Sequence, residues 1–495
     1  MQPSLFNLVV DKSGNYPVYV QIANQLIIQI REGNLHAGQQ LPSTRQLAES
    51  LQVHRKTVVR AYDELTAQGW LESRSGSGTF AATHLPEVKP EKLDRQQPLT
   101  NPAQSAGFDF STSPHLEIGF KKDKCTYHLD DGFPDPRIAP LADLSRAYRS
   151  QLLIGDRYSK LGYTDPQGSL WLRGELATYL TETRGLNVTA DNILITRGTV
   201  MGVYLTATGL IQPGDQVVTG ETGWTTAEAA FIQSGAKITR LPVDGYGIQV
   251  DELERICRKS PVRLVYVTSH HHYPTTVALR ADRRMQLLRL AEKYRFIIFE
   301  DDYDYDFHYD NKPLLPLASA DRSGLVLYCG SFTKTISPAF RVGYLIGSAD
   351  VIRHMAQLRR IIDRQGDTML ENAIAELLQN GIIQRHMRKS LRIYKQRRDL
   401  FCSLMKDQLS DCTSFAIPDG GMAVWTNFDP RINLFELSRK ALKKDLYFAG
   451  GVSHPSQTMP WNATRLGFAS SSDKELILSV EILSDLIKND YIFVK

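Results

Sequence analysis

Residues 330–344 of this chain read Gly330-Ser331-Phe332-Thr333-Lys334-Thr335-Ile336-Ser337-Pro338-Ala339-Phe340-Arg341-Val342-Gly343-Tyr344. They follow the apolar run Leu325–Cys329, which predicts a buried strand that ends in a hydroxyl-rich turn. Lys334 in such a turn is placed to act as a nucleophile beside a phosphate, and Arg341 supplies a second cation. A lone lysine after Ser-x-Thr is usually a surface residue, so the surrounding sequence has to decide between the two interpretations.

Three more β-rich runs upstream also end in glycine or polar residues. The runs are Asn192–Thr196, Leu264–Thr268 and Phe296–Phe299, and they lead into Arg197-Gly198-Thr199-Val200, Ser269–Pro274 and Glu300–Tyr303. From about Cys125 onward such runs alternate with longer helical segments, which predicts an α/β domain with a mostly parallel sheet. Because ligands bind beyond the carboxyl ends of parallel strands, we expect these strand ends to form one site.

The residue types at these strand ends suit a pyridine aldehyde phosphate. Lys334 offers the amine for a Schiff base. The ring nitrogen needs a buried carboxylate that keeps it protonated, and we predict Asp301 rather than Asp302 for this contact. The predicted cofactor is therefore pyridoxal 5'-phosphate (PLP).

The cofactor's phosphate and ring face also find candidates. Backbone N–H groups of Thr199 and Val200, at the start of a helix, are predicted to hold the phosphate with help from the helix dipole. Arg341 is predicted to neutralise the same phosphate. Trp224 is predicted to stack on the ring, with ordinary core packing as the alternative.

Two neighbouring segments favour plainer interpretations. The later part of Glu300–Asp310 is expected to be a solvated loop, whereas the apolar strand before Asp301 argues that this end is buried. His270-His271-His272 suggests a metal site, but adjacent residues of an extended segment point to opposite faces, so we expect none. The five cysteines show no C-x-x-C pairing, which fits free thiols in a reducing compartment.

Residues 1–81 are predicted to form a compact helical unit with a hairpin. Apolar residues from Val18 to Ile30 recur at helical spacing, and Ser43 with Gln46 makes a capping box for a second helix that runs to about Leu51. The predicted apolar face of a third helix is Val58, Ala61, Tyr62 and Leu65. Residues 70–80, with a Gly76/Gly78 turn, predict a two-stranded hairpin. Two short helices joined by a tight turn predict a helix-turn-helix whose second helix enters the major groove.

The overall composition sets the domain organisation. A chain of 495 residues is too long for one hydrophobic core. Residues 82–122 are rich in proline and polar residues and predict a linker, which leaves 123–495 for the α/β domain.

A net charge of +4 says little about partners, although the segment Arg45–Arg60 carries four cations and one acid. The first residues lack the basic region of a signal peptide and no apolar stretch is long enough for a bilayer, so we expect a cytoplasmic protein without a membrane partner.

The motifs resemble two known families. Residues 41–48, Arg55–Tyr62 and Ser75–Phe80 closely resemble the GntR winged-helix family over residues 16–80. The 330–344 stretch, Glu300–Asp304 and Tyr163–Gly168 with Leu172-Arg173 resemble the fold-type I aminotransferases. Together they resemble the MocR subfamily of GntR-type regulators, in which a winged helix-turn-helix is fused to an aminotransferase-like domain.

The resemblance implies roles for individual residues. Lys334 would carry the aldimine, Tyr303 would bond the cofactor's phenolic oxygen, and Arg465 would hold the ligand's α-carboxylate. Ser331, Thr333 and Arg341 would bind the phosphate, with Tyr163 contributing from the second subunit of a head-to-tail homodimer. The implied contacts to double-stranded operator DNA are Arg45, Arg55, Thr57, Arg60 and Gly76.

The chain also departs from the family pattern. Pro274-Thr275-Thr276 replaces the usual Pro-Thr-Gly, and His271-His272 replaces His-Gln. Val200 stands where Gln is usual and Trp224 where Tyr is usual. These differences concern the surroundings of the phenolic oxygen and the identity of the ligand.

Three functions remain open from the sequence. The first is a transcription regulator that senses an amino compound through PLP on Lys334. The second is an active aminotransferase with an appended DNA-binding module, and a half-reaction stays possible in either case. The third is a regulator that senses PLP itself.

Overall fold

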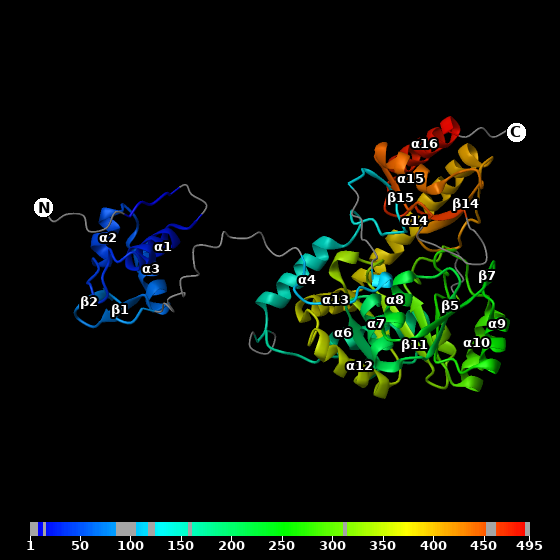
Figure 1. The fold of residues 1–495 in the computed structure, drawn as a ribbon, viewed down its shortest axis with the longest axis horizontal. Helices are drawn as coiled ribbons and strands as arrows, with labels where there is room; N and C mark the ends of the chain where they lie inside the picture. Colours follow the sequence, from blue (N-terminus) through cyan, green and yellow to red (C-terminus); the bar gives the residue numbers. More distant parts are fainter. Residues whose placement is uncertain are drawn as a thin grey trace. The chain divides into compact units, whose positions relative to one another are not determined.

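The computed structural model describes residues 8–12, 16–85, 105–116, 124–156, 161–309, 314–451 and 462–490. The chain divides into two compact units, Met1–Ser111 and Thr112–Lys495, which are described separately (Figure 1). Most of the linker expected at 82–122 lies outside the described residues.

The first unit is built on three helices, α1 (Val18–Arg31), α2 (Thr44–Ser50) and α3 (Arg55–Ala67). The predicted capping box is present, because the Ser43 side chain accepts from the Gln46 backbone N–H and the Gln46 side chain accepts from Ser43 N–H. The predicted apolar face of α3 is the one that is buried. These side chains pack against Ile22, Leu26 and Ile30 of α1, so the small core needs all three helices.

A hairpin completes this unit. Strands β1 (Leu71–Arg74) and β2 (Gly78–Ala81) pair antiparallel (Figure 1). Gly76 and Gly78 turn the chain with φ of +74° and +111°, which side chains rarely tolerate. The Leu41 backbone N–H donates to the Thr79 carbonyl at 2.8 Å, so the segment before α2 is held against the hairpin.

The second unit contains a seven-stranded sheet in the order β4-β12-β11-β10-β9-β5-β6. The strands are β4 (Ile193–Thr196), β5 (Gln216–Gly220), β6 (Lys237–Leu241), β9 (Leu264–Val267), β10 (Ile297–Asp302), β11 (Val326–Ser331) and β12 (Gly343–Ile346). All of them run in one direction except β12, which pairs antiparallel with both β11 and β4. The sheet is therefore mostly parallel, as predicted.

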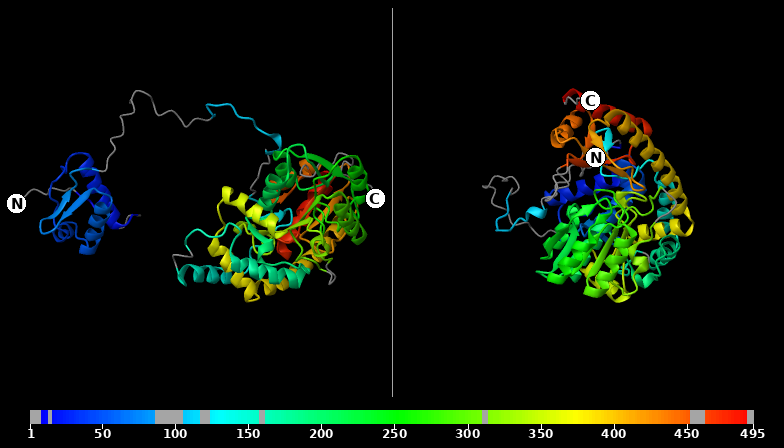
Figure 2. Two further views of the ribbon diagram at one scale, coloured as in Figure 1. Left: turned by 90° about the horizontal axis from the view of Figure 1, so that it is seen from below. Right: turned by 90° about the vertical axis from the view of Figure 1, so that its right-hand side faces the viewer.

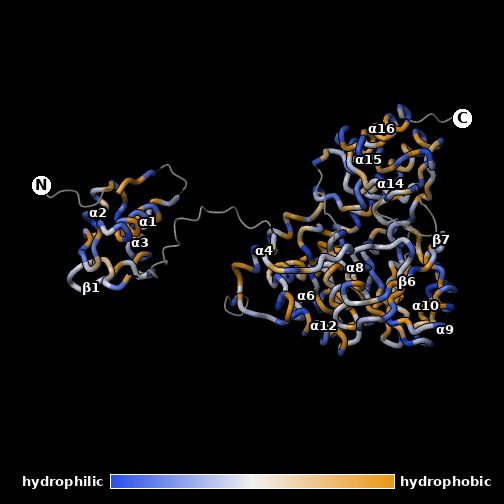
Figure 3. Tube along the Cα trace, in the orientation of Figure 1, coloured by the Kyte–Doolittle hydropathy of each residue, from blue (hydrophilic) through white to orange (hydrophobic). Residues whose placement is uncertain are grey.

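Helices cover both faces of this sheet. One face packs on α7 (Thr199–Leu210), α8 (Thr225–Gln233) and α12 (Ala349–Ile362). The other face packs on α9 (Val250–Lys259) and α10 (Ala281–Tyr294), and towards β4 on α6 (Leu170–Arg184) and α13 (Thr368–Gln379). Hydrophobic and hydrophilic residues alternate along α9, α10 and α12, as expected for helices that pack on a sheet with one side and face solvent with the other (Figure 3).

The C-terminal part adds a second, smaller layer. The sheet β13 (Thr413–Ser414), β14 (Ala423–Phe428) and β16 (Ala463–Gly467) packs with α15 (Leu434–Lys443) and α16 (Asp473–Asp490). The long helix α14 (Ile382–Leu409) packs on α16 of this part and on α13, which covers the seven-stranded sheet (Figure 2). Strand β3 (Tyr127–Leu129) pairs with β15 (Leu446–Phe448) and leads into residues 130–133, which reach the site described below.

The second unit also contains helix α4 and several short elements. These are α4 (Leu141–Leu153), α11 (Leu317–Ala320), the hairpin of β7 (Val243–Asp244) and β8 (Gly247–Ile248), and the 3-10 turns at Pro114–Leu116, Ala190–Asn192 and Pro338–Phe340. None of the helices that the structure describes has both the length and the apolar character that a membrane crossing requires.

One sequence-based expectation about this unit is wrong. The later part of the Glu300–Asp310 segment was expected to be a solvated loop, but Asp304, Phe307 and Tyr309 are buried. The C-terminal part covers this segment, since Tyr309 N–H donates to the Asp419 carbonyl and Gly421 N–H donates to the Phe307 carbonyl. Asp310 itself lies outside the described residues.

Candidate functional site

Lys334 follows the end of β11 and faces a turn from the start of the second unit. Its Nζ donates to the Gly132 carbonyl at 2.6 Å and lies 4.6 Å from the centre of the Phe133 ring. Burial lowers the pKa of Lys334, because the ammonium form loses its hydration, while the nearby Asp131 carboxylate opposes the change. A lowered pKa increases the share of neutral amine, which is the form that attacks a carbonyl.

Asp301 and Asp302 point to opposite faces of the central sheet. Asp301 Oδ2 accepts a bond from the Tyr266 hydroxyl at 2.7 Å, on the face that packs on α7. Asp302 Oδ2 accepts from Tyr328 at 2.6 Å, on the other face. Burial raises the pKa of Asp301 to about 7, and Tyr266 partly counteracts this. Asp301 Oδ1 accepts no hydrogen bond from any residue that the structure describes.

The predicted phosphate residues meet where β12 lies beside β4. Gly198, with φ of +76°, precedes α7, and within the described chain no side chain caps the first N–H groups of that helix. Arg341 donates from Nη2 to the Arg197 carbonyl at 2.9 Å. A Cβ on Gly198 would lie 2.8 Å from the same Nη2, so a larger residue would displace the guanidinium. Helix amides and a cation thus converge here.

The hydroxyl groups of Ser331 and Thr333 are the other predicted phosphate ligands. Ser331 Oγ donates to Thr333 Oγ1 at 2.6 Å and accepts from the Thr333 backbone N–H at 3.0 Å. This turn fixes the backbone directly before Lys334. The structure therefore brings Ser331, Thr333 and Lys334 together in one tight turn.

Arg465 and Tyr303 belong to a buried polar cluster, which the Asp131–Gly132 turn connects to Lys334. Arg465 comes from β16, and its Nε lies 3.2 Å from Asp131 Oδ1. The Tyr303 hydroxyl donates to the His271 carbonyl at 2.9 Å, and Arg465 Nη1 lies 3.4 Å from this hydroxyl. The Tyr273 hydroxyl donates to the second Asp131 oxygen at 2.9 Å.

The three histidines have separate partners. His271 Nδ1 bonds Asp304 at 2.8 Å, His272 Nε2 donates to the Thr222 carbonyl at 2.7 Å, and His270 Nε2 donates to the Leu314 carbonyl. Burial lowers the pKa of His272 to about 4. Across the described ranges, no three His, Cys, Asp or Glu side chains gather as metal ligands would.

Trp224 and Tyr163 occupy very different surroundings. Trp224 precedes α8 and packs, partly buried, against the core between α7 and the sheet. Tyr163 is 78% exposed and stacks under the Arg364 guanidinium at 3.8 Å. Its described contacts do not include the residues around Lys334.

Three residues of the site were not predicted from the sequence. Tyr266 pairs in register with Phe299, two residues before Asp301, so the strand period of two places it on the Asp301 face. That signal is available only once the pairing of β9 and β10 is known. Asp131 and Gly132 come from far upstream, and the short run Asp130-Asp131-Gly132 gave no indication by itself.

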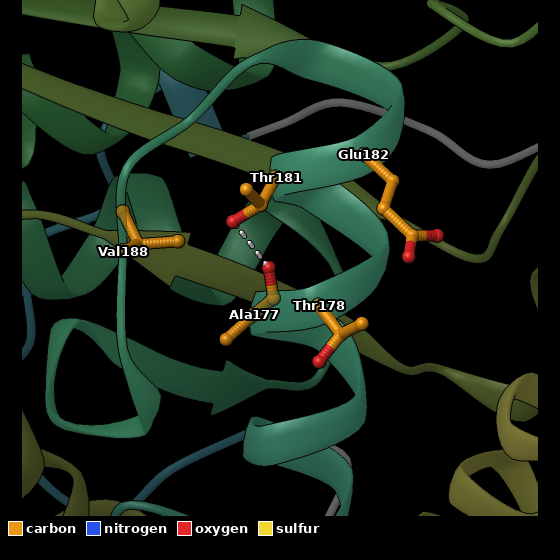
Figure 4. A pocket seen from close by; sticks show the side chains of 5 residues that line it. All are labelled: Ala177, Thr178, Thr181, Glu182 and Val188. Atoms are coloured by element: carbon orange, nitrogen blue, oxygen red, sulfur yellow. Dashed lines mark hydrogen bonds between the residues drawn. The ribbon is translucent and has the colours of Figure 1, made fainter.

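A separate hollow lies on the outer side of α6. It has a volume of about 320 Å³ and is lined by Ala177, Thr178, Thr181, Glu182 and Val188 (Figure 4). Thr181 Oγ1 donates to the Ala177 carbonyl at 2.8 Å. The hollow shares no residue with the Lys334 cluster.

In the first unit, the predicted DNA contacts lie on α2, α3 and the hairpin. Arg45 and Arg55 are exposed, and Arg55 Nε lies 3.4 Å from Thr44 Oγ1. Arg60 stacks on the Tyr19 ring at 3.9 Å and donates to its hydroxyl at 3.2 Å. Thr57 is half-buried on α3, and Gly76 forms the exposed hairpin turn.

Comparisons with known proteins agree with this architecture. The family model for aminotransferase class I and II matches residues 135–481, and that for bacterial regulatory proteins of the gntR family matches residues 18–81. The chain is 29% identical to the probable rhizopine catabolism regulatory protein MocR of Rhizobium meliloti, over 95% of this chain and 93% of that protein. It is also 29% identical to the uncharacterized HTH-type transcriptional regulator YdfD of Bacillus subtilis (strain 168), over 96% and 98%.

Solved structures match the second unit. An archaeal alanine:glyoxylate aminotransferase is 28% identical with a TM-score of 0.69, covering 74% of this chain and 91% of that chain. A Pyrococcus horikoshii kynurenine aminotransferase is 26% identical with a TM-score of 0.67, covering 74% and 91%. The cofactor that goes with this fold is PLP, in agreement with the prediction. The chain belongs to the aminotransferase class I and II family and joins that domain to a GntR-type winged helix-turn-helix, which is the architecture of the MocR regulators.

Proposed function

We propose that this protein is a transcription regulator that binds PLP at Lys334 and changes its DNA binding when an amino compound enters the site. The observation that carries the proposal is the joining, in one chain, of a winged helix-turn-helix to the cluster around Lys334, Asp301 and Arg341. The regulators that match nearly the whole chain support the DNA-binding role. We place the DNA-binding domain at 1–81, the linker at 82–122 and the effector domain at 123–495.

The residues around Lys334 fit PLP. Asp301 offers a carboxylate oxygen, without a hydrogen bond from the described part of the chain, that suits a protonated ring nitrogen. The start of α7, the Ser331–Thr333 turn and Arg341 suit its phosphate, and Trp224 and Tyr303 are assigned to its ring and phenolic oxygen. When bound, PLP supplies an aldehyde carbon that condenses with primary amines. Lys334 holds and releases the proton at its Nζ, and burial favours the neutral form.

We also propose a homodimer, and an apolar surface on the second unit supports it. Ile361 is 83% exposed, Leu161 65% and Tyr163 78%. The stacking of Arg364 on Tyr163 places the 161–163 loop beside the end of α12, which carries Ile361, so these three side chains belong to one region. Large exposed apolar regions mark interaction surfaces. In a head-to-tail dimer, Tyr163 would reach the site of the second subunit.

A route from the site towards the linker runs through α8. The 3-10 turn Pro114–Leu116 packs on this helix, and His115 Nε2 bonds Gln233 Oε1 at 3.0 Å. The same helix begins next to Trp224. A shift of α8 would therefore move the end of the linker. A regulator of operator DNA acts in the cytoplasm, and we propose this location.

DNA binding by the full-length protein tests this function. Duplexes selected from a random-sequence library would be titrated with apo protein, PLP-loaded protein and PLP-loaded protein plus a panel of primary amines and amino acids. We expect specific binding that changes when an amine is added to the PLP-loaded form. Lys334→Ala should bind DNA but lose the response. DNA binding that no amine alters, or no specific DNA binding, would overturn the proposal.

An aminotransferase remains the second candidate, because the solved neighbours named above are aminotransferases. Turnover assays with amino donors and keto acids separate the two functions. Steady turnover at metabolic rates, without an effect on DNA affinity, would favour the enzyme. A regulator that senses PLP itself would instead distinguish apo protein from the PLP-loaded form and ignore added amines.

A further inference from the structure

Arg465 already has a carboxylate partner within the chain. The Arg465 side chain is 2% exposed, whereas that of Asp131, its partner at 3.2 Å, is 38% exposed. The second Asp131 oxygen accepts from the Tyr273 hydroxyl at 2.9 Å. A cation and a hydroxyl thus hold the two oxygens of Asp131, as they would hold the carboxylate of an amino acid.

The backbone beside Asp131 is firmly anchored. Asp130 Oδ1 accepts from the Gly132 and Phe133 N–H groups at 3.0 and 2.9 Å. The Asp130 carbonyl accepts from Gly467 N–H at 2.6 Å, two residues after Arg465. Rotation of the Asp131 side chain towards solvent would therefore separate it from Arg465 and leave the backbone bonds of the turn in place.

The same turn reaches the reactive lysine, because the Gly132 carbonyl accepts from Lys334 Nζ. An amine that takes the place of Lys334 on the PLP aldehyde carbon would thus arrive beside a pair that is already neutral. An α-amino acid brings a second carboxylate to Arg465, and two like charges at one cation repel each other. A primary amine without a carboxylate leaves the Asp131–Arg465 pair intact.

We propose that Asp131 selects the effector class by competing with ligand carboxylates for Arg465, so that primary amines without an α-carboxylate bind in preference to α-amino acids. This inference rests on the proposed function, since it assumes that amines enter at Lys334. It also changes the role of Arg465, which becomes the partner of Asp131 rather than the anchor of the effector.

The test compares two ligands that differ only in the carboxylate. L-Phenylalanine and phenethylamine would be titrated by calorimetry into full-length, PLP-loaded wild type and Asp131→Asn. Asn keeps an oxygen for the Tyr273 hydroxyl but lacks the charge. We expect wild type to bind phenethylamine more tightly, and Asp131→Asn to shift the ratio of dissociation constants at least about tenfold towards the amino acid, roughly the effect of one partly buried charge pair.

Control variants separate the competition for Arg465 from effects of removing any negative charge. Asp131→Glu keeps the carboxylate and should keep the wild-type ratio. Asp282→Asn removes a surface charge paired with Arg280 and should do the same. If Asp131→Asn fails to fold, Tyr273→Phe, which loosens the same carboxylate, should shift the ratio in the same direction but less. A ratio that stays at the wild-type value in the folded variant, or a wild type that prefers phenylalanine, would overturn the inference.

A probe without an amine keeps this test distinct from that of the proposed function. Propionate carries a carboxylate but does not condense with PLP, and it should bind Asp131→Asn more tightly than wild type. If no amine binds any variant although PLP is present, the proposed function fails, while the propionate result still decides the role of Asp131. Equal propionate affinities in the two proteins would count against the competition.

Discussion

Asp301 should make the stability of the apo protein depend on pH in a defined window. Burial raises the pKa of Asp301 to about 7 from an ordinary value of 3.8. Between these pH values the folded protein binds a proton that the unfolded chain has lost, so this group's contribution to stability falls as the pH rises. At about 1.4 kcal/mol for each pKa unit, the loss amounts to about 4 kcal/mol by pH 8.

The substitution Asp301→Asn removes this dependence. Asn has the same shape and can accept from the Tyr266 hydroxyl, but it does not titrate in this range. We expect the free energy of unfolding of Asp301→Asn to match wild type near pH 4 and to exceed it by about 4 kcal/mol at pH 8. PLP should reverse the order at pH 8, because the protonated ring nitrogen pairs with the carboxylate of wild type and finds no counter-charge in the variant.

Urea unfolding of full-length apo protein at several pH values, followed by tryptophan fluorescence, measures the effect. Four of the five tryptophans belong to the second unit, so the main transition reports on the unit that contains Asp301. The difference between variants is the relevant quantity, because other groups titrate equally in both. Asp282→Asn serves as the surface control and should run parallel to wild type between pH 4 and 8. A constant difference between Asp301→Asn and wild type across this window would refute the reasoning.

The other predictions concern a histidine, the DNA-binding face and the dimer. Burial lowers the pKa of His272 to about 4 from 6.5. The stability that the buried neutral imidazole contributes is therefore complete above pH 6.5 and is lost as the pH falls towards 4. This amounts to about 3 kcal/mol, and His272→Gln should lack this loss in urea unfolding. Arg55→Ala and Arg60→Ala should each weaken specific DNA binding while leaving the PLP absorbance unchanged. Arg60→Ala also loses the stacking on Tyr19 and so needs a melting curve as control, and unaltered DNA affinity would remove either residue from the contact set. Tyr163→Ala should weaken PLP retention in the dimer without changing the fold, measured by dialysis and circular dichroism, and equal retention would argue against a contribution from the second subunit.

Local sequence signals predicted much of the fold. The Ser43–Gln46 capping box and the buried face of α3 depend on spacings within one or two helical turns. The four strands that lead to the site were recognisable as short apolar runs, although β10 extends further than expected and includes Asp301 and Asp302. Such features need only neighbouring residues.

Long-range packing accounts for what the sequence did not indicate. The burial of Asp304 to Tyr309 depends on contacts with residues 419–421, more than a hundred positions away. The Tyr266–Asp301 bond depends on which strands are neighbours, and the Asp131–Arg465 pair joins the two ends of the second unit. No pattern within a window of residues indicates such pairs.

The proposed function depends on the attachment of the cofactor to Lys334. Borohydride reduction of PLP-loaded protein, followed by peptide mass spectrometry, measures it directly. We expect a single pyridoxyl group, on the peptide that contains Lys334 and at that residue. A pyridoxyl group on another lysine, or none on protein soaked in PLP, would contradict it.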